Sequence, residues 1–178
     1  ERELAFAGHP TIGTATYVLS RISPSSDTEA VRGTLITKAG PVGLEYSLAD
    51  RAVRIAIPHN VHIHQATVDQ EQLLESQPGL QESGARGKLP QSSAVVSIVK
   101  GMTFIMIELG SLDDLGAVTT TATCIRPQLD EEWSYSFVGG YFYVRLPDAG
   151  DGAIRLRSRM IEGTLEDPAT GSATSGCC

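Results

Sequence analysis

The sequence has no cluster of basic residues and no long apolar stretch. Its formal net charge is −7 over 178 residues, with 14 Lys and Arg against 21 Asp and Glu. Binding to nucleic-acid phosphates needs concentrated positive charge, so we expect no nucleic-acid partner. No apolar run approaches the ~20 residues that a membrane-spanning helix needs, so we expect no membrane partner either.

Cysteine is also scarce. The chain has three cysteines, and two of them are adjacent at positions 177 and 178. This pattern does not build a disulfide framework, and we also expect no secretory signal. These features together predict a cytoplasmic protein.

Helical and strand patterns are both present. Apolar residues at helical spacing predict a helix over residues 10–22, where Pro10 suits the first turn. Two further short helices are expected at 69–76 and 111–117. Short alternating runs predict antiparallel strands at 34–37, 42–46 and 52–57. A hairpin that turns at Lys100-Gly101 is expected from 94–99 and 103–109, and further strands are expected at 134–146 and 154–160.

The segment from Gln77 to Ser93 is rich in Gly, Pro, Ser and Gln, and this composition predicts a linker. We therefore expect an N-terminal lobe over residues 1–85 and a C-terminal lobe over 86–178. The predicted fold class is α+β, with two pseudo-symmetric lobes. Each lobe is expected to be a curved, barrel-like antiparallel sheet around a central helix.

Two short segments at opposite ends of the chain resemble each other. Residues 9–16, HPTIGTAT, align with residues 167–174, DPATGSAT, with four of eight positions identical. A repeat of this kind favours a duplicated unit. We therefore expect His9 and Asp167 to lie at two equivalent helix starts that border one cleft.

The second segment has features of both a helix start and a ligand site. Asp167 before Pro168 is a common way to cap a helix, and we expect it to cap one here. Gly171 is a poor residue for a first helical turn, but it lets a ligand approach the backbone closely. The hydroxyl of Ser172 adds a hydrogen-bond donor. An anionic group such as a carboxylate would suit this position.

His9 stands where a helix cap belongs, although histidine is a weak cap. One interpretation is a solvated surface histidine. The other is an ionisable group held at a helix start for proton transfer. The similarity to the segment around Asp167 favours the second interpretation.

Three histidines lie close together in the sequence PHNVHIHQ: His59, His62 and His64. On a strand, His62 and His64 would share a face, and this spacing suits a metal, with Asp69 or Glu71 as a third ligand. The alternative, a polar strand edge, is the interpretation we adopt, so no metal site and no cofactor are predicted. Three acidic residues before Trp133 are interpreted as a solvated turn.

The motifs FAGHPTIGTA (6–15) and EDPATGSA (166–173) together resemble those of the PhzF, or phenazine-biosynthesis-like, isomerase/epimerase family. Diaminopimelate epimerase is related and has the same two-lobed fold, but it uses paired cysteines as bases. This sequence has no cysteine at either motif, so it resembles the PhzF branch. The resemblance implies a diaminopimelate-epimerase-like fold with its active site between the lobes. It also implies a cofactor-independent isomerase that moves a proton on a small carboxylate-bearing substrate by acid/base catalysis.

The resemblance also implies roles for individual residues. His9 resembles the active-site histidine of the family, and Asp167 resembles its proton-shuttling aspartate. Gly8, Gly171 and Ser172 resemble the residues that position the substrate.

The principal catalytic glutamate of the family precedes the first motif, in a segment that these 178 residues do not contain. We therefore expect a chain truncated at both ends, with impaired turnover. The alternative is a non-catalytic remnant that acts as a binding or assembly module, and a third hypothesis is a metal-dependent enzyme that uses the histidines. Exposed strand edges would favour association, so a homodimer is also considered.

Overall fold

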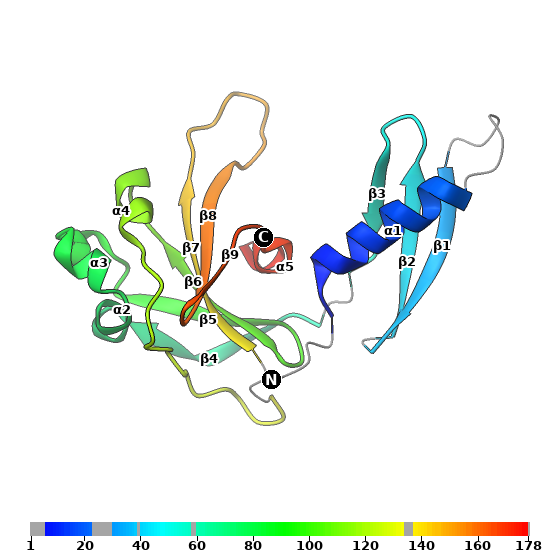
Figure 1. The fold of residues 1–178 in the computed structure, drawn as a ribbon. Coiled ribbons are helices and arrows are strands. Elements are labelled where there is room, and N and C mark those ends of the chain that lie inside the picture. Colours follow the sequence, from blue (N-terminus) through cyan, green and yellow to red (C-terminus); the bar gives the residue numbers. More distant parts are fainter. Residues whose placement is uncertain (1–5, 23–29, 39, 58–59, 134–136, 178) are drawn as a thin grey trace. The chain divides into compact units, whose positions relative to one another are not determined.

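The computed structural model describes residues 6–22, 30–38, 40–57, 60–133 and 137–177 (Figure 1). By internal contacts the chain divides into two compact units, Glu1–His59 and Asn60–Cys178. The predicted boundary after residue 85 differs from this division. The reason is that the strand His62–Asp69 pairs with Ser92–Val99 in the second unit, so residues 60–85 pack there.

The first unit is a helix on a three-stranded sheet. Its elements are α1 (Gly8–Ile22), β1 (Ala30–Thr37), β2 (Gly40–Ser47) and β3 (Ala52–Ile55). The strands are antiparallel in the order β1-β2-β3, and α1 lies along one face of this sheet (Figure 1). Ala15 and Leu19 of α1 pack against Val42, Leu44 and Tyr46 of β2. The predicted helix and strands of this region are confirmed, since helical spacing and alternation each placed the apolar side chains toward this core.

The second unit is built on a six-stranded sheet with the order β4-β5-β6-β7-β8-β9. Its strands are β4 (His62–Asp69), β5 (Ser92–Val99), β6 (Met102–Glu108), β7 (Phe137–Arg145), β8 (Leu156–Glu162) and β9 (Leu165–Asp167). Its helices are α2 (Gln70–Ser76), α3 (Pro78–Glu82), η1 (Ala85–Lys88), α4 (Leu112–Ala117), α5 (Gly171–Thr174) and η2 (Ser175–Cys177).

Both faces of the middle strands are buried, and neighbouring residues belong to different cores. In β6, Ile105 and Ile107 join the core shared with α2, α3 and α4, whereas Phe104 and Met106 face the other way. The second core is completed by Ala173 of α5. Because side chains alternate along the strand, one face of the sheet packs against α2, α3 and α4. The other face packs against the C-terminal motif that contains α5.

Strands β6 and β7 pair in parallel, with Met102 opposite Phe137 and Glu108 opposite Tyr143. The prediction of purely antiparallel sheets is wrong at this pair. Parallel neighbours need a crossover connection, and α4 and the residues after it supply one. The α+β class is confirmed. Among the described strands neither sheet closes into a barrel, and the pseudo-symmetric barrel-like lobes stay a prediction.

The predicted linker at 77–93 is also wrong. Pro78 starts α3, η1 follows, and the side chains of Leu80, Ala85 and Leu89 are buried in the core beside β5 and β6. The turn-forming residues of this segment begin or end short helices rather than forming an extended connection. In the described residues, no helix has the length and apolar character to span a membrane.

Candidate functional site

Gly8 and His9 belong to the first turn of α1 in the first unit. The helix begins at Gly8, so His9 is its second residue and not the cap that the sequence suggested. Its side chain is exposed and Gly8 is half-buried. The next turn is fixed by Thr11, whose hydroxyl donates to the carbonyl oxygen of Ala7 at 2.8 Å.

Asp167 lies at the end of β9, where it is paired with Met160 of β8. Its carboxylate accepts the N–H of Ala169 at 3.2 Å and the hydroxyl of Thr170 at 2.7 Å. The prediction that Asp167 caps a helix starting at Pro168 is wrong, because that helix, α5, starts at Gly171 with Thr170 before it. Asp167 instead closes a turn between strand and helix, and this turn holds the half-buried carboxylate in one orientation.

Gly171 and Ser172 begin α5. Gly171 is exposed, its N–H donates to Ala169 at 3.1 Å, and a Cβ at this position would meet no atom within 4 Å. Ser172 is half-buried. The next two residues attach this short helix to the sheet, since Ala173 is fully buried and the Thr174 hydroxyl lies 2.7 Å from that of Tyr141.

The structure thus brings the predicted residues together in two groups. Asp167, Gly171 and Ser172 share one strand–turn–helix segment of the second unit, and Gly8 and His9 share the first turn of α1 in the first unit. The expectation that the two groups border one cleft stays a prediction.

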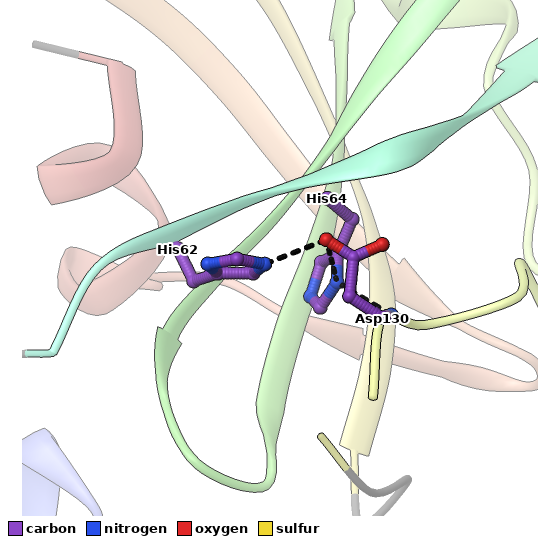
Figure 2. A group of neighbouring side chains, drawn as sticks. All are labelled: His62, His64 and Asp130. Atoms are coloured by element: carbon purple, nitrogen blue, oxygen red, sulfur yellow. Dashed lines mark hydrogen bonds and ion pairs between the residues drawn. The ribbon is translucent and has the colours of Figure 1, made fainter. Parts of the chain in front are cut away.

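A third group of polar side chains was not predicted as a site. His62 and His64 of β4 point toward Asp130, which lies in the segment between α4 and β7 (Figure 2). His62 Nε2 lies 2.7 Å from Asp130 Oδ2, and the backbone N–H of Asp130 donates to His64 Nδ1 at 3.1 Å. The backbone N–H of Gln65 also donates to the Asp130 carboxylate, at 3.2 Å. We call His62, His64 and Asp130 the histidine cluster.

The protonation of the cluster follows from its hydrogen bonds. Because His64 Nδ1 accepts the amide of Asp130, the ring hydrogen is on Nε2, which donates to Ser97 at 2.8 Å. Burial and the neighbouring His62 lower the pKa of His64, against an opposing effect of Asp130. The hydrogen bond from His62 lowers the pKa of the Asp130 carboxyl, with the Gln65 amide adding to this effect. At neutral pH the cluster therefore holds a neutral His64 beside an ionised Asp130.

Trp133 shields one side of this cluster. Its ring stacks on His62 with 4.8 Å between centroids and 14° between planes, and it meets His64 edge-on at 5.6 Å. The predicted solvated turn is confirmed for Glu131 and Glu132, which are exposed residues of a turn, but it is wrong for Asp130 and Trp133, which are half-buried against the histidines. A tryptophan among acidic residues was the signal that could have indicated a packed polar contact.

The predicted third ligands lie elsewhere. Asp69 caps α2 through a hydrogen bond from the N–H of Gln72 at 2.8 Å, and Glu71 pairs with Arg86 at 2.7 Å. His59 lies outside the described residues. That His62 and His64 share a strand and approach each other is confirmed, with 4.8 Å between their ring centroids.

Comparison with known proteins adds the family. Among curated proteins, none matches this chain. The family model described as phenazine biosynthesis-like protein (PhzC-PhzF) matches residues 1–177, which include both end motifs and the whole of the six-stranded sheet. The chain therefore belongs to the phenazine biosynthesis-like (PhzC-PhzF) family.

Proposed function

We propose that this chain is a PhzF-like isomerase or epimerase that moves a proton on a small, carboxylate-bearing substrate by general acid/base catalysis. The family is generally one of isomerases, and the match extends over nearly the whole chain. The observation that carries the proposal within the chain is the turn at Asp167, where a half-buried carboxylate is oriented by Ala169 and Thr170.

In this proposal Asp167 and His9 are the proton carriers. Two hydrogen bonds orient the carboxylate of Asp167, which can take a proton from a substrate carbon. An ionisable group on the far side of the substrate returns a proton at another position or on the opposite face. His9 suits this role because its exposed ring lies at the start of a 15-residue helix. Atoms and charge balance, since one proton leaves the substrate and one enters it.

Gly8, Gly171 and Ser172 hold the substrate in this proposal. The start of α1 carries partial positive charge and backbone N–H groups, so a carboxylate near Gly8 is stabilised there. Gly171 has open space where a side chain would stand, which allows close approach of a ligand. Ser172 supplies a hydroxyl. The proposal keeps the two motifs as borders of one cleft between two related lobes, in a cytoplasmic protein that needs no cofactor for the proton transfer.

Deuterium incorporation from D₂O tests this function. The protein is incubated with a panel of cyclic and aromatic carboxylates, and exchange at carbon is followed by NMR. Asp167→Asn keeps the size of the side chain but removes its basicity, so exchange should fall by about 10²–10⁴-fold. Asp148→Asn is the matched control, because Asp148 also holds a loop turn, through the N–H of Gly150 at 2.8 Å.

Equal exchange by the wild type and Asp167→Asn would overturn the role of Asp167. Binding of a carboxylate at both motifs, seen as NMR shifts, with no exchange for any substrate of the panel would favour the alternative of a binding module. A fall in exchange that is as large in Asp148→Asn would show a structural effect and would also contradict the proposal.

A further inference from the structure

The histidine cluster brings three different ligand groups to one point. One suitable atom from each of His62, His64 and Asp130 lies within 4.8 Å of the other two. Both histidines come from one strand, whereas the aspartate is contributed by a segment more than sixty positions later. Figure 2 shows the two rings and the carboxylate directed toward each other.

The surroundings of His64 orient its ring in the way that metal-binding histidines require. The hydrogen of Nε2 goes to Ser97 at 2.8 Å, and Ser97 in turn lies 2.6 Å from the hydroxyl of Thr103. Both hydroxyl residues are buried on β5 and β6. An outer partner on one ring nitrogen fixes the tautomer and leaves the lone pair of the other nitrogen, Nδ1, on the side of Asp130.

We propose that the histidine cluster is a binding site for a divalent transition metal of the zinc class. The ligands would be His62 Nε2, His64 Nδ1 and one carboxylate oxygen of Asp130. Two imidazoles and a carboxylate are a common set for zinc, with water in the fourth position of a tetrahedron. The side chains of His62 and Asp130 are 36% and 23% exposed, so solvent reaches the cluster on that side.

The ligand atoms lie within 4.8 Å of one another, so they must shift to reach the geometry of a bound ion. Zinc–ligand bonds of about 2.0–2.2 Å place tetrahedral ligands roughly 3.3 Å apart. The Oδ2 atom of Asp130 now lies 2.7 Å from His62 Nε2 and 3.9 Å from His64 Nδ1, on either side of that separation. The ion replaces the hydrogen between His62 and Asp130. It also displaces the amide N–H of Asp130 from His64 Nδ1.

The consequence of this site is a cross-link and not a reaction step. The ion would join β4 to the segment between α4 and β7, in addition to the hydrogen bonds already there. Binding to the folded form alone stabilises the fold by mass action, so the melting temperature should rise with metal concentration. The proposal is independent of proton transfer at Asp167, which lies on a different part of the sheet.

Calorimetric titration with Zn²⁺ and absorption of the Co²⁺ form test the site. The wild type should bind one equivalent, with the visible bands of tetrahedral Co²⁺ and an increase in melting temperature. Asp130→Asn is the decisive variant, because an amide can still accept hydrogen bonds from His62 and Gln65 but binds metal poorly. It and His62→Gln should each weaken binding at least tenfold, since removing even an outer partner of a metal ligand costs about 10–100-fold in affinity.

Two control variants separate this site from other metal-binding groups. His9→Gln removes a histidine of the first unit, and Cys177→Ser/Cys178→Ser removes the adjacent thiols. Both should bind Zn²⁺ like the wild type. The proposal is overturned if the wild type does not bind at micromolar metal, if Asp130→Asn binds as tightly as the wild type, or if a control variant abolishes binding. The first of these outcomes would leave the cluster as a hydrogen-bonded contact between two segments.

Discussion

Arg159 and Glu166 form a two-point ion pair between β8 and β9. Arg159 Nε lies 2.7 Å from Oε1 of Glu166, and a terminal guanidinium nitrogen lies 2.7 Å from Oε2. The other terminal nitrogen donates to the carbonyl oxygens of Leu115 at 3.2 Å and Val118 at 2.5 Å, at the end of α4. One side chain thus joins a helix end to the strand residue that directly precedes Asp167.

Replacing Arg159 with lysine should destabilise the second unit. Lysine keeps the charge but cannot form the planar pair and reach the α4 carbonyls at the same time. We expect a loss of about 1–2 kcal/mol in the free energy of unfolding, the size of one or two hydrogen bonds. Urea unfolding measures it, with Arg157→Lys as a control at an exposed position of the same strand. Equal stability of the two variants would contradict the importance of the contacts of Arg159.

The same ion pair predicts a dependence of stability on pH. The hydrogen bonds from Arg159 lower the pKa of the Glu166 carboxyl. A lowered pKa in the folded state means that the stabilisation is present above the unfolded value, near 4.3, and is lost as the pH falls through the folded value. Because 27% of the Arg159 and 35% of the Glu166 side chain are exposed, solvent screening limits the effect to about 1 kcal/mol or less.

Glu166→Gln removes this titration. Its unfolding free energy should lie below that of the wild type at pH 7, and the difference should shrink as the pH is lowered below about 4.3. Chemical unfolding of both proteins across this range measures the difference. If the difference in unfolding free energy stays constant down to acidic pH, the charge of Glu166 does not contribute to the stability of this contact.

Local patterns in the sequence predicted most strands and helices of this fold. The sequence indicated β5 and β6 as a hairpin that turns at Lys100-Gly101, and Gly101 has a φ of +89°, which suits glycine. The pattern did not predict that β6 and β7 are parallel. Both strands are buried on both faces, and a run of apolar residues carries no information on strand direction.

At the candidate sites, too, the sequence predicted contacts between neighbours in the chain but not contacts between distant segments. The motif around Asp167 was visible in the sequence, because its residues are neighbours in the chain and interact through one turn. The partner of His62 was not visible, because Asp130 reaches it only through packing between segments that are 68 positions apart. The composition of residues 77–93 led to the wrong prediction of a linker. Turn-forming residues dominate this segment, but its Leu80 and Leu89 belong to the core.

Gly79 in this misread segment is predicted to be required for packing. A Cβ there would overlap the carbonyl oxygen of Ala117 and come within 3.1 Å of Thr119 Cγ2. Because backbone atoms of α4 cannot yield easily, Gly79→Ala should cost about 1–3 kcal/mol, although alanine is the better helix residue. Gly87→Ala in η1 is the control, since its Cβ would meet nothing within 4 Å. Thermal unfolding that ranks the two variants as equal would contradict the close contact of α3 and α4.

The last prediction concerns the attachment of the C-terminal motif to the sheet. The hydroxyl groups of Tyr141 and Thr174 are 2.7 Å apart, and Tyr141 is 1% exposed. Tyr141→Phe keeps the packing but removes the link, so the unfolding free energy should fall by about 0.5–1.5 kcal/mol. Amide hydrogen exchange in residues 170–174 should accelerate, because α5 is then held mainly by the contacts of Ala173.

Tyr143→Phe is the matched control for this effect. Tyr143 lies on the same face of β7, but its hydroxyl donates to Glu108 at 3.3 Å rather than to α5. Its removal should therefore leave the exchange of residues 170–174 unchanged. Similar acceleration in both variants would mean that the tyrosine hydroxyls act on the whole sheet. No acceleration of exchange in Tyr141→Phe would mean that packing alone fixes the short helix beside Asp167. The hydrogen bond between Tyr141 and Thr174 would then not hold the motif in place.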